Sequence, residues 1–197
     1  RQLGNVGWSW DDVLPYFKKS EDFQFGENEF RGSGGPIKVE KIRSTFKVLD
    51  LFLEAAEEFG YKKTDDFNNG NNEGMGYFPL TVKNGFRCST AVGYLNPAKS
   101  RKNLHIVTNA HVKKINFENK IAKEVEYWQG DKLKKVSSSK EIILSSGSIG
   151  SPQILQTSGI GNSQKLKELG IDIVHELKGV GENLQDHLMF RPIYKVN

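Results

Sequence analysis

The sequence predicts a mixed α/β fold (α+β) that contains an antiparallel β-meander, and three observations predict it. An amphipathic helix follows Ser44. A series of strands separated by tight turns occupies residues 104–138. A strand at 141–145 then runs into a glycine-rich turn and a further helix. The 197 residues are enough for one domain or for parts of two.

The first elements along the chain are a short helix and a strand. Ser9 can cap the helix, Asp11 suits the positive end of its dipole, and Pro15 kinks or restarts it. A glycine-rich loop over 26–35 separates this helix from an alternating strand over 36–40. The side chains that we expect to be buried here are Trp8, Trp10, Leu14, Phe17 and Phe23.

The most regular helix begins after Ser44 and ends at Gly60. Its apolar residues recur at spacings of three and four, namely Phe46, Leu49, Leu53 and Ala56. Glycine commonly follows the last residue of a helix, as Gly60 does here. A polar loop over 65–76 and a strand over 77–82 come next.

The middle of the chain changes from helix to strand. Ser89 or Thr90 caps a helix that reaches Asn96 and is stopped by Pro97. The strands expected after this helix are 104–108, 111–117, 121–128 and 133–138. Their short connections force antiparallel neighbours, so these strands form a meander.

The segment after the meander is a corner made of a strand, a turn and a helix. Ile142–Leu144 are three consecutive large apolar residues, which indicates a strand buried on both faces. Ser151 and Pro152 suit the cap and the first position of the helix. A further helix over 163–169 and a strand over 171–174 follow.

The composition disfavours several classes of protein. The net charge is +4, but the lysines lie among acidic residues, which is typical of a solvated surface and not of a nucleic-acid-binding face. No stretch reaches the roughly 18 consecutive apolar residues of a membrane span. The single cysteine, Cys88, excludes an intramolecular disulfide and is interpreted as a packing residue. We expect a location in the cytoplasm or at the periphery of the inner membrane.

The segment Gly147–Gly161, GSIGSPQILQTSGIG, has the residues best suited to a ligand. Its glycines allow the backbone to approach a ligand closely. The helix that starts near Pro152 has free N–H groups that suit an anion or a polar ring edge. The residues alone, however, favour a corner whose glycines serve only tight packing over a ligand site.

The same segment resembles the second signature of the glucose-methanol-choline (GMC) oxidoreductase family. The matching positions are Gly147, Ser148, Ser151, Pro152, Leu155, Ser158, Gly159, Ile160 and Gly161. Other blocks that resemble the family, in family order, are GWSWDDVLPYFKKSED, GGPIKVE, NGFRCSTAVGYLNPA, NLHIVTNAHVKKI and GVGENLQDH. The resemblance runs from Gly4 to about Tyr194, and LQDHLMFRPIYKV indicates the choline-dehydrogenase-like branch.

The resemblance implies an incomplete fold, with part of an FAD-binding Rossmann-like domain and part of a substrate-binding domain. Four segments are expected: 1–32 as an extension of the FAD domain, 33–80 in the substrate domain, 81–187 in the FAD-binding domain, and 188–197 at the start of a second substrate-domain segment. The family's first glycine-rich fingerprint, G-x-G-x-x-G after a strand, is missing from the sequence. We therefore interpret the chain as an internal piece of a longer protein.

The resemblance also implies FAD as the cofactor and assigns three residues to it. The main chain of Val112 would pair with the adenine edge. Ser146 and Gly147 would end the strand that passes close to the cofactor. No metal site is expected.

The implied reaction is the oxidation of an alcohol, choline-like or another primary alcohol, with hydride transfer to flavin N5 and an electron acceptor that the sequence does not identify. Family members use a His-His or His-Asn pair to take the alcohol proton. That pair would lie beyond Asn197, so no catalytic residue is assigned here, and we expect the chain alone to be inactive. The four histidines, which are His105, His111, His175 and His187, are interpreted as structural.

Two alternatives stay open. A lyase that keeps FAD as a structural element and cleaves cyanohydrins would have the same fold. A non-enzymatic basic binding module would fit the net charge, although the ordered family blocks disfavour it.

Overall fold

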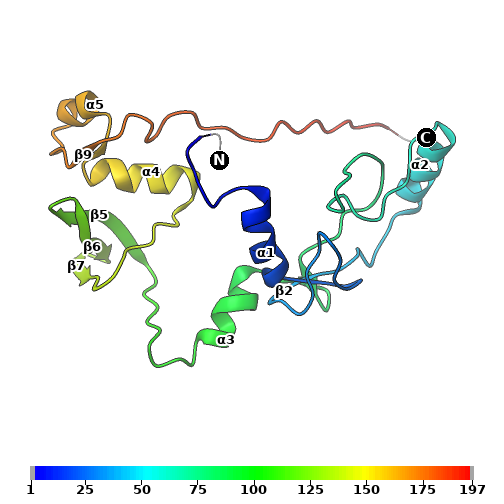
Figure 1. Cartoon of the computed structure of the whole chain (residues 1–197), viewed down its shortest axis with the longest axis horizontal. Helices are drawn as coiled ribbons and strands as arrows, with labels where there is room; N and C mark the ends of the chain where they lie inside the picture. The colour runs from blue at the N-terminus through cyan, green and yellow to red at the C-terminus, as the bar shows by residue number, and fades with distance from the viewer. Residues whose placement is uncertain (1–2, 196–197) are drawn as a thin grey trace. The chain divides into compact units, whose positions relative to one another are not determined.

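The computed structural model describes residues 3–195. The chain divides into two compact units, residues 1–105 and 106–197. Figure 1 shows the helices and strands of both units. The predicted mixture of helices and strands is confirmed, because both units contain both kinds of element.

The first unit begins with helix α1, Trp10–Ser20, which starts where the sequence predicted. Both the main-chain N–H and the hydroxyl of Ser9 donate hydrogen bonds to the carboxylate of Asp12, at 3.0 and 2.6 Å. These bonds lower the pKa of Asp12, and its negative charge lies at the positive end of the helix dipole. The helix leads directly into strand β1, Glu21–Phe23, which pairs in parallel with β2, Ile37–Val39.

The expected burial around α1 is wrong for three of its five residues. Phe23 is buried and Leu14 is partly buried. Trp8, Trp10 and Phe17 are exposed, since no described element covers that face of the helix. The apolar pattern therefore identifies a face that this part of the chain does not itself cover.

Helix α2, Lys47–Glu58, ends as predicted but begins later. Gly60 has a positive φ of 97°, the conformation expected just after a helix. The predicted cap at Ser44 is wrong, because the carbonyl of Phe46 accepts the N–H groups of Leu49 and Asp50 at 2.8 and 3.0 Å. Main-chain groups thus begin this helix without a polar side-chain cap.

The end of the first unit is less regular than predicted. Of the strand expected over 77–82, only β3, Val82–Lys83, forms, and it pairs with β4, Phe86–Arg87, across a tight turn. The predicted helix is a π-helix, η1, at Ala91–Leu95, continued by α3 at Asn96–Ala98. Pro97 does not stop it, because proline near the start of a helical turn removes no needed N–H.

The second unit contains the predicted meander with three strands. These are β5, Ala110–Glu118, β6, Ile121–Gln129, and β7, Lys132–Ser137. They pair antiparallel in the order β5-β6-β7, so β5 is an edge strand. The strand predicted at 104–108 does not form.

Helix α4, Gly147–Thr157, follows the meander. Two short strands pair in parallel, β8 at Ile160–Gly161 and β9 at His175–Glu176, and between them lies α5, Ser163–Glu168. The buried side chain of Leu166 on α5 is the centre of this part.

Two predictions for the corner before α4 are wrong. Residues 141–145 form no strand, and Ile143 is 80% exposed, because an extended segment becomes a strand only when a neighbour pairs with it. The helix begins at Gly147 and not at Pro152, and Pro152 lies inside it. The strand expected at 171–174 is also displaced, to β9.

Candidate functional site

The site predicted around Val112 lies on the edge strand β5, beside a β-bulge. Val112 pairs with Tyr127, whereas Lys114 pairs with Glu126, so Lys113 is an extra residue without a partner on β6. A bulge of this kind locally bends the strand and increases its twist. Val112 is therefore the last regularly paired residue before the distortion.

The main-chain groups of Val112 face the open edge of β5. The N–H of Ile115 points away from β6, because it donates to the side chain of Ser158 at 2.8 Å. Ile115 pairs with Val125, and Tyr127 lies two positions further along β6. Since antiparallel pairs alternate between bonded and non-bonded, the Val112–Tyr127 pair is also of the non-bonded kind.

Two hydroxyl groups at the end of α4 attach this helix to the same open edge. The hydroxyl of Ser158 accepts the N–H of Ile115 and donates to the carbonyl of Ile154, one turn back in α4. The hydroxyl of Thr157 lies 3.1 Å from the carbonyl of Lys113. Ser158 is only 5% exposed, so its hydrogen bonds are shielded from water, whereas Thr157 is exposed.

The predicted turn at Ser146 and Gly147 lies at the opposite end of α4. Gly147 has φ of +81°, a conformation that favours glycine, and the space that a side chain would fill is open. The N–H of Ser146 donates to the hydroxyl of Ser151 at 3.0 Å. The backbone of this turn is therefore exposed and accessible to a ligand.

The structure joins the elements that carry the three predicted residues. Val112 lies on β5 and the Ser146–Gly147 turn begins α4, and these two elements pack together. The 11 residues of α4 span about 16 Å, which separates the turn from the attachment at Ser158. A site that uses both ends must therefore fit an elongated ligand.

The four histidines are exposed, and none is held against an acidic side chain in residues 3–195. The carboxylate of Asp186 accepts the main-chain N–H of His187 at 2.7 Å, so it is engaged with backbone. This arrangement does not resemble an acid–base pair.

Cys88 is buried as predicted, with its thiol against the carbonyl of Pro36.

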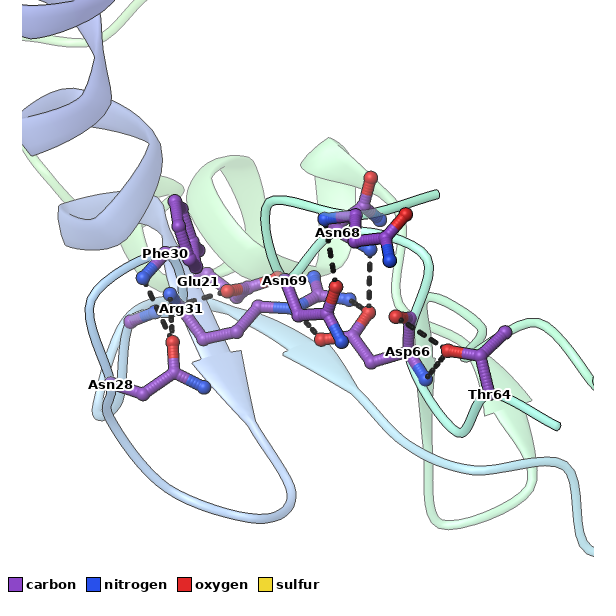
Figure 2. Close-up of polar contacts among 10 residues, drawn as sticks. Glu21, Asn28, Phe30, Arg31, Thr64, Asp66, Asn68 and Asn69 are labelled. Carbon is purple, nitrogen blue, oxygen red and sulfur yellow. Dashed lines mark hydrogen bonds and ion pairs between the residues drawn. The ribbon is translucent and has the colours of Figure 1, made fainter. Parts of the chain in front are cut away.

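The first unit contains a buried charge cluster that the sequence did not indicate. The guanidinium of Arg31 binds both carboxylate oxygens of Asp66, and it donates to Glu21 at 2.6 Å (Figure 2). It also lies 4.4 Å from the ring centre of Phe23. The cluster joins β1 to the polar loop after α2, although Arg31 and Asp66 are 35 positions apart.

Charge and burial act in opposite directions on the pKa values of this cluster. Burial raises the pKa of Asp66, but the bonds from Arg31 and from the N–H of Asn68 outweigh it and the net shift is downward. The hydrogen bond to Asp66 raises the pKa of Arg31 further. The charges of Arg31 and Asp66 are therefore both held in the ionised state.

A cavity of about 660 Å³ lies against this cluster. Its aromatic lining consists of Trp10, Phe17, Phe30 and Phe67, and its polar lining includes Glu21, Arg31, Asn68 and Asn72. Because each of the three guanidinium nitrogens of Arg31 donates to Asp66 or Glu21, this side chain offers no free charge to an anion here. In the sequence, Arg31 is followed by the glycine-rich stretch Gly32–Gly35 and has no distinctive spacing to Glu21 or Asp66, so no sequence pattern located the cluster.

A second charge cluster lies on the meander. Asn116 donates to Glu124 and Glu126, at 2.8 and 3.0 Å, and Lys135 lies 3.0 Å from both carboxylates. The bond from Asn116 and then that from Lys135 lower the pKa of Glu126 to about 2. This cluster ties the three strands together and has no part in the predicted site.

Nearly the whole chain is similar to one family of proteins. The model of the family described as GMC oxidoreductase matches residues 1–189. The oxygen-dependent choline dehydrogenase of Pectobacterium carotovorum is 46% identical over 187 residues, which cover 94% of this chain and 34% of that protein. The mitochondrial choline dehydrogenase of Homo sapiens is 43% identical over 188 residues, which cover 95% of this chain and 32% of that protein.

Solved structures give the same result. An FAD-dependent oxidoreductase from Chaetomium thermophilum has a TM-score of 0.84 and 35% identity, over 94% of this chain and 34% of that one. Pyridoxine 4-oxidase from Mesorbium loti has a TM-score of 0.86 and 28% identity, over 93% of this chain and 36% of that one. The chain thus spans about a third of the length of these relatives.

Among the described helices, none has the length and apolar character needed to cross a membrane.

Proposed function

Because this chain belongs to the GMC oxidoreductase family, we propose that the complete protein binds FAD and oxidises an alcohol of the choline type. The similarity to choline dehydrogenases over nearly the whole chain carries the proposal. The FAD-dependent relative from Chaetomium thermophilum supports the cofactor. The choline-dehydrogenase-like branch is the one that the sequence itself indicated.

The residues that would hold FAD are Val112, Ser146 and Gly147. The main chain of Val112 faces an open strand edge, where an N–H and a carbonyl suit the donor and acceptor groups of an adenine edge. The turn at Gly147 leaves its backbone open, which suits a close approach. The span of α4 between these places matches the need of a dinucleotide for an elongated site.

When bound, FAD would accept the hydride that leaves the carbinol carbon, at its N5 atom. The residues of this chain would bind and orient, and the proton of the alcohol would be taken by a histidine pair elsewhere in the complete protein. The exposed histidines of the described residues support this division of roles. The four segments 1–32, 33–80, 81–187 and 188–197 remain our proposed assignment to the FAD and substrate domains.

The proposal is tested by adding choline to the complete protein without oxygen and following the visible absorption of flavin. Bleaching is expected with choline and not with tetramethylammonium, which has the same charged group but no hydroxyl. Bound flavin that no alcohol bleaches would favour the FAD-containing lyase, and cyanohydrin cleavage would identify it. A protein purified without flavin, and unable to take it up, would overturn the proposal.

We also propose a location in the cytoplasm or at the periphery of the inner membrane. Cell fractionation, followed by detection of the protein in each fraction, tests it. Release of the protein from membranes by high salt would identify the peripheral location.

A further inference from the structure

The open edge of β5 has main-chain groups that point away from β6 at three residues, which are Val112, Lys113 and Ile115. The carbonyl of Lys113 and the N–H of Ile115 are taken by the hydroxyls of Thr157 and Ser158. The next position toward the start of the strand is Val112, whose main-chain groups face the same edge. The hydroxyls of Thr157 and Ser158 thus form the hydrogen bonds that a neighbouring strand would otherwise form with this edge. The main-chain groups of Val112 stay open.

We propose that Ser158 and Thr157 are positioning residues for the adenine contact, because they hold the bulge that sets where the main chain of Val112 lies. This inference rests on the proposed function, since it takes Val112 as the residue that pairs with adenine. A bulge is a local distortion that the ladder itself does not fix, because its extra residue has no partner. Here the extra residue, Lys113, is fixed from outside the sheet.

Ser158 supplies most of the constraint. Its hydroxyl accepts from Ile115 and donates to Ile154, so both its hydrogen-bonding roles are used in a buried place. Loss of the hydroxyl leaves the buried N–H of Ile115 without a partner, which is costly unless the strand moves. Movement of the strand displaces Val112, three residues away.

Thr157 acts at the bulge itself. Its hydroxyl lies 3.1 Å from the carbonyls of both Lys113 and Ile154, and its one proton is shared between them. Valine has the shape of threonine without the hydroxyl. Because Thr157 is exposed, Thr157→Val should leave the packing of the protein unchanged. This variant therefore separates the effect on the bulge from an effect on folding.

The experiment measures binding of ADP, which carries the adenine and diphosphate of FAD without the flavin. The complete apoprotein is prepared from riboflavin-starved cells and titrated by calorimetry. We expect Thr157→Val to weaken ADP binding several-fold and Ser158→Ala about tenfold. Thr157→Ser keeps the hydroxyl and should restore the wild-type affinity.

Ser138→Ala is the matched control, because this serine also donates to a main-chain carbonyl in the same unit, that of Glu141. It should leave ADP affinity unchanged. Equal affinity of the wild type, Thr157→Val and a folded Ser158→Ala would overturn the inference while leaving the proposed function intact. If the wild type binds neither ADP nor FAD, the proposed function is overturned, and the inference with it.

Discussion

Arg31 donates two parallel hydrogen bonds to the carboxylate of Asp66, a residue 35 positions later in the sequence. The side chains of this pair are nearly buried, and Glu21 of strand β1 forms a second ion pair with Arg31. A planar guanidinium matches the two oxygens of a carboxylate, which a lysine does not do. The polar loop that contains Asp66 is therefore held in place by charge, since it has no apolar periodicity of its own.

Arg31→Met should lower the free energy of unfolding of the complete protein by about 3 kcal/mol, because it leaves Asp66 and Glu21 buried without their cation. Arg31→Lys should recover part of this loss. Urea denaturation measures both. The control is Lys63→Met, which breaks the exposed pair with Glu57 and should change the free energy of unfolding much less. Equal losses for Arg31→Met and Lys63→Met would contradict this account.

Glu126 should stabilise the folded protein at neutral pH, and this contribution should be lost at acid pH. Its pKa falls from 4.5 to about 2 in the folded protein, so the folded state favours the ionised form. The contribution is fully present above pH 4.5 and is lost as the pH falls toward 2. The difference in Tm between wild type and Glu126→Gln should therefore shrink between pH 5 and pH 3. Glu118→Gln, at an exposed position at the end of β5, is the control, and a difference for Glu126→Gln that does not vary with pH would contradict the prediction.

Two glycines near α4 should respond differently to alanine. Gly147 has φ of +81° but open space around it, so Gly147→Ala should cost only the backbone strain of about 1 kcal/mol. Gly159 has φ of +85°, and an added Cβ would lie 2.3 Å from the carbonyl oxygen of Asp172. Gly159→Ala should therefore cost roughly 3 kcal/mol, since backbone must move. Thermal unfolding of both variants checks the order, and a larger loss for Gly147→Ala would refute it.

The 197-residue chain by itself should not oxidise alcohol and should not unfold cooperatively. Its accessible surface is 16250 Å². Two separately folded units that share this mass would expose about 11,300 Å². Much of the excess is apolar, including Phe46, Phe52 and Phe59 around α2. Assays with added FAD, together with calorimetry, test this, and a sharp transition or detectable turnover would contradict it.

The predictions that succeeded depend on local chemistry. Ser9 and Gly60 mark a helix start and a helix end because their effects act within one turn. The meander was predicted because short turns leave its strands no other arrangement. The strand at 141–145 and the burial of Trp10 failed, because both need partners that no described residue provides.

The sequence by itself determined the family, the meander and the segments that resemble the cofactor site, because these depend on the order of residues and on short-range pairing. Only the tertiary structure decided that Arg31 meets Asp66, and that Ser158 and Thr157 close part of the edge of β5 beside Val112. Such contacts join residues tens of positions apart. They depend on how the chain returns in space, which no local pattern of residues specifies.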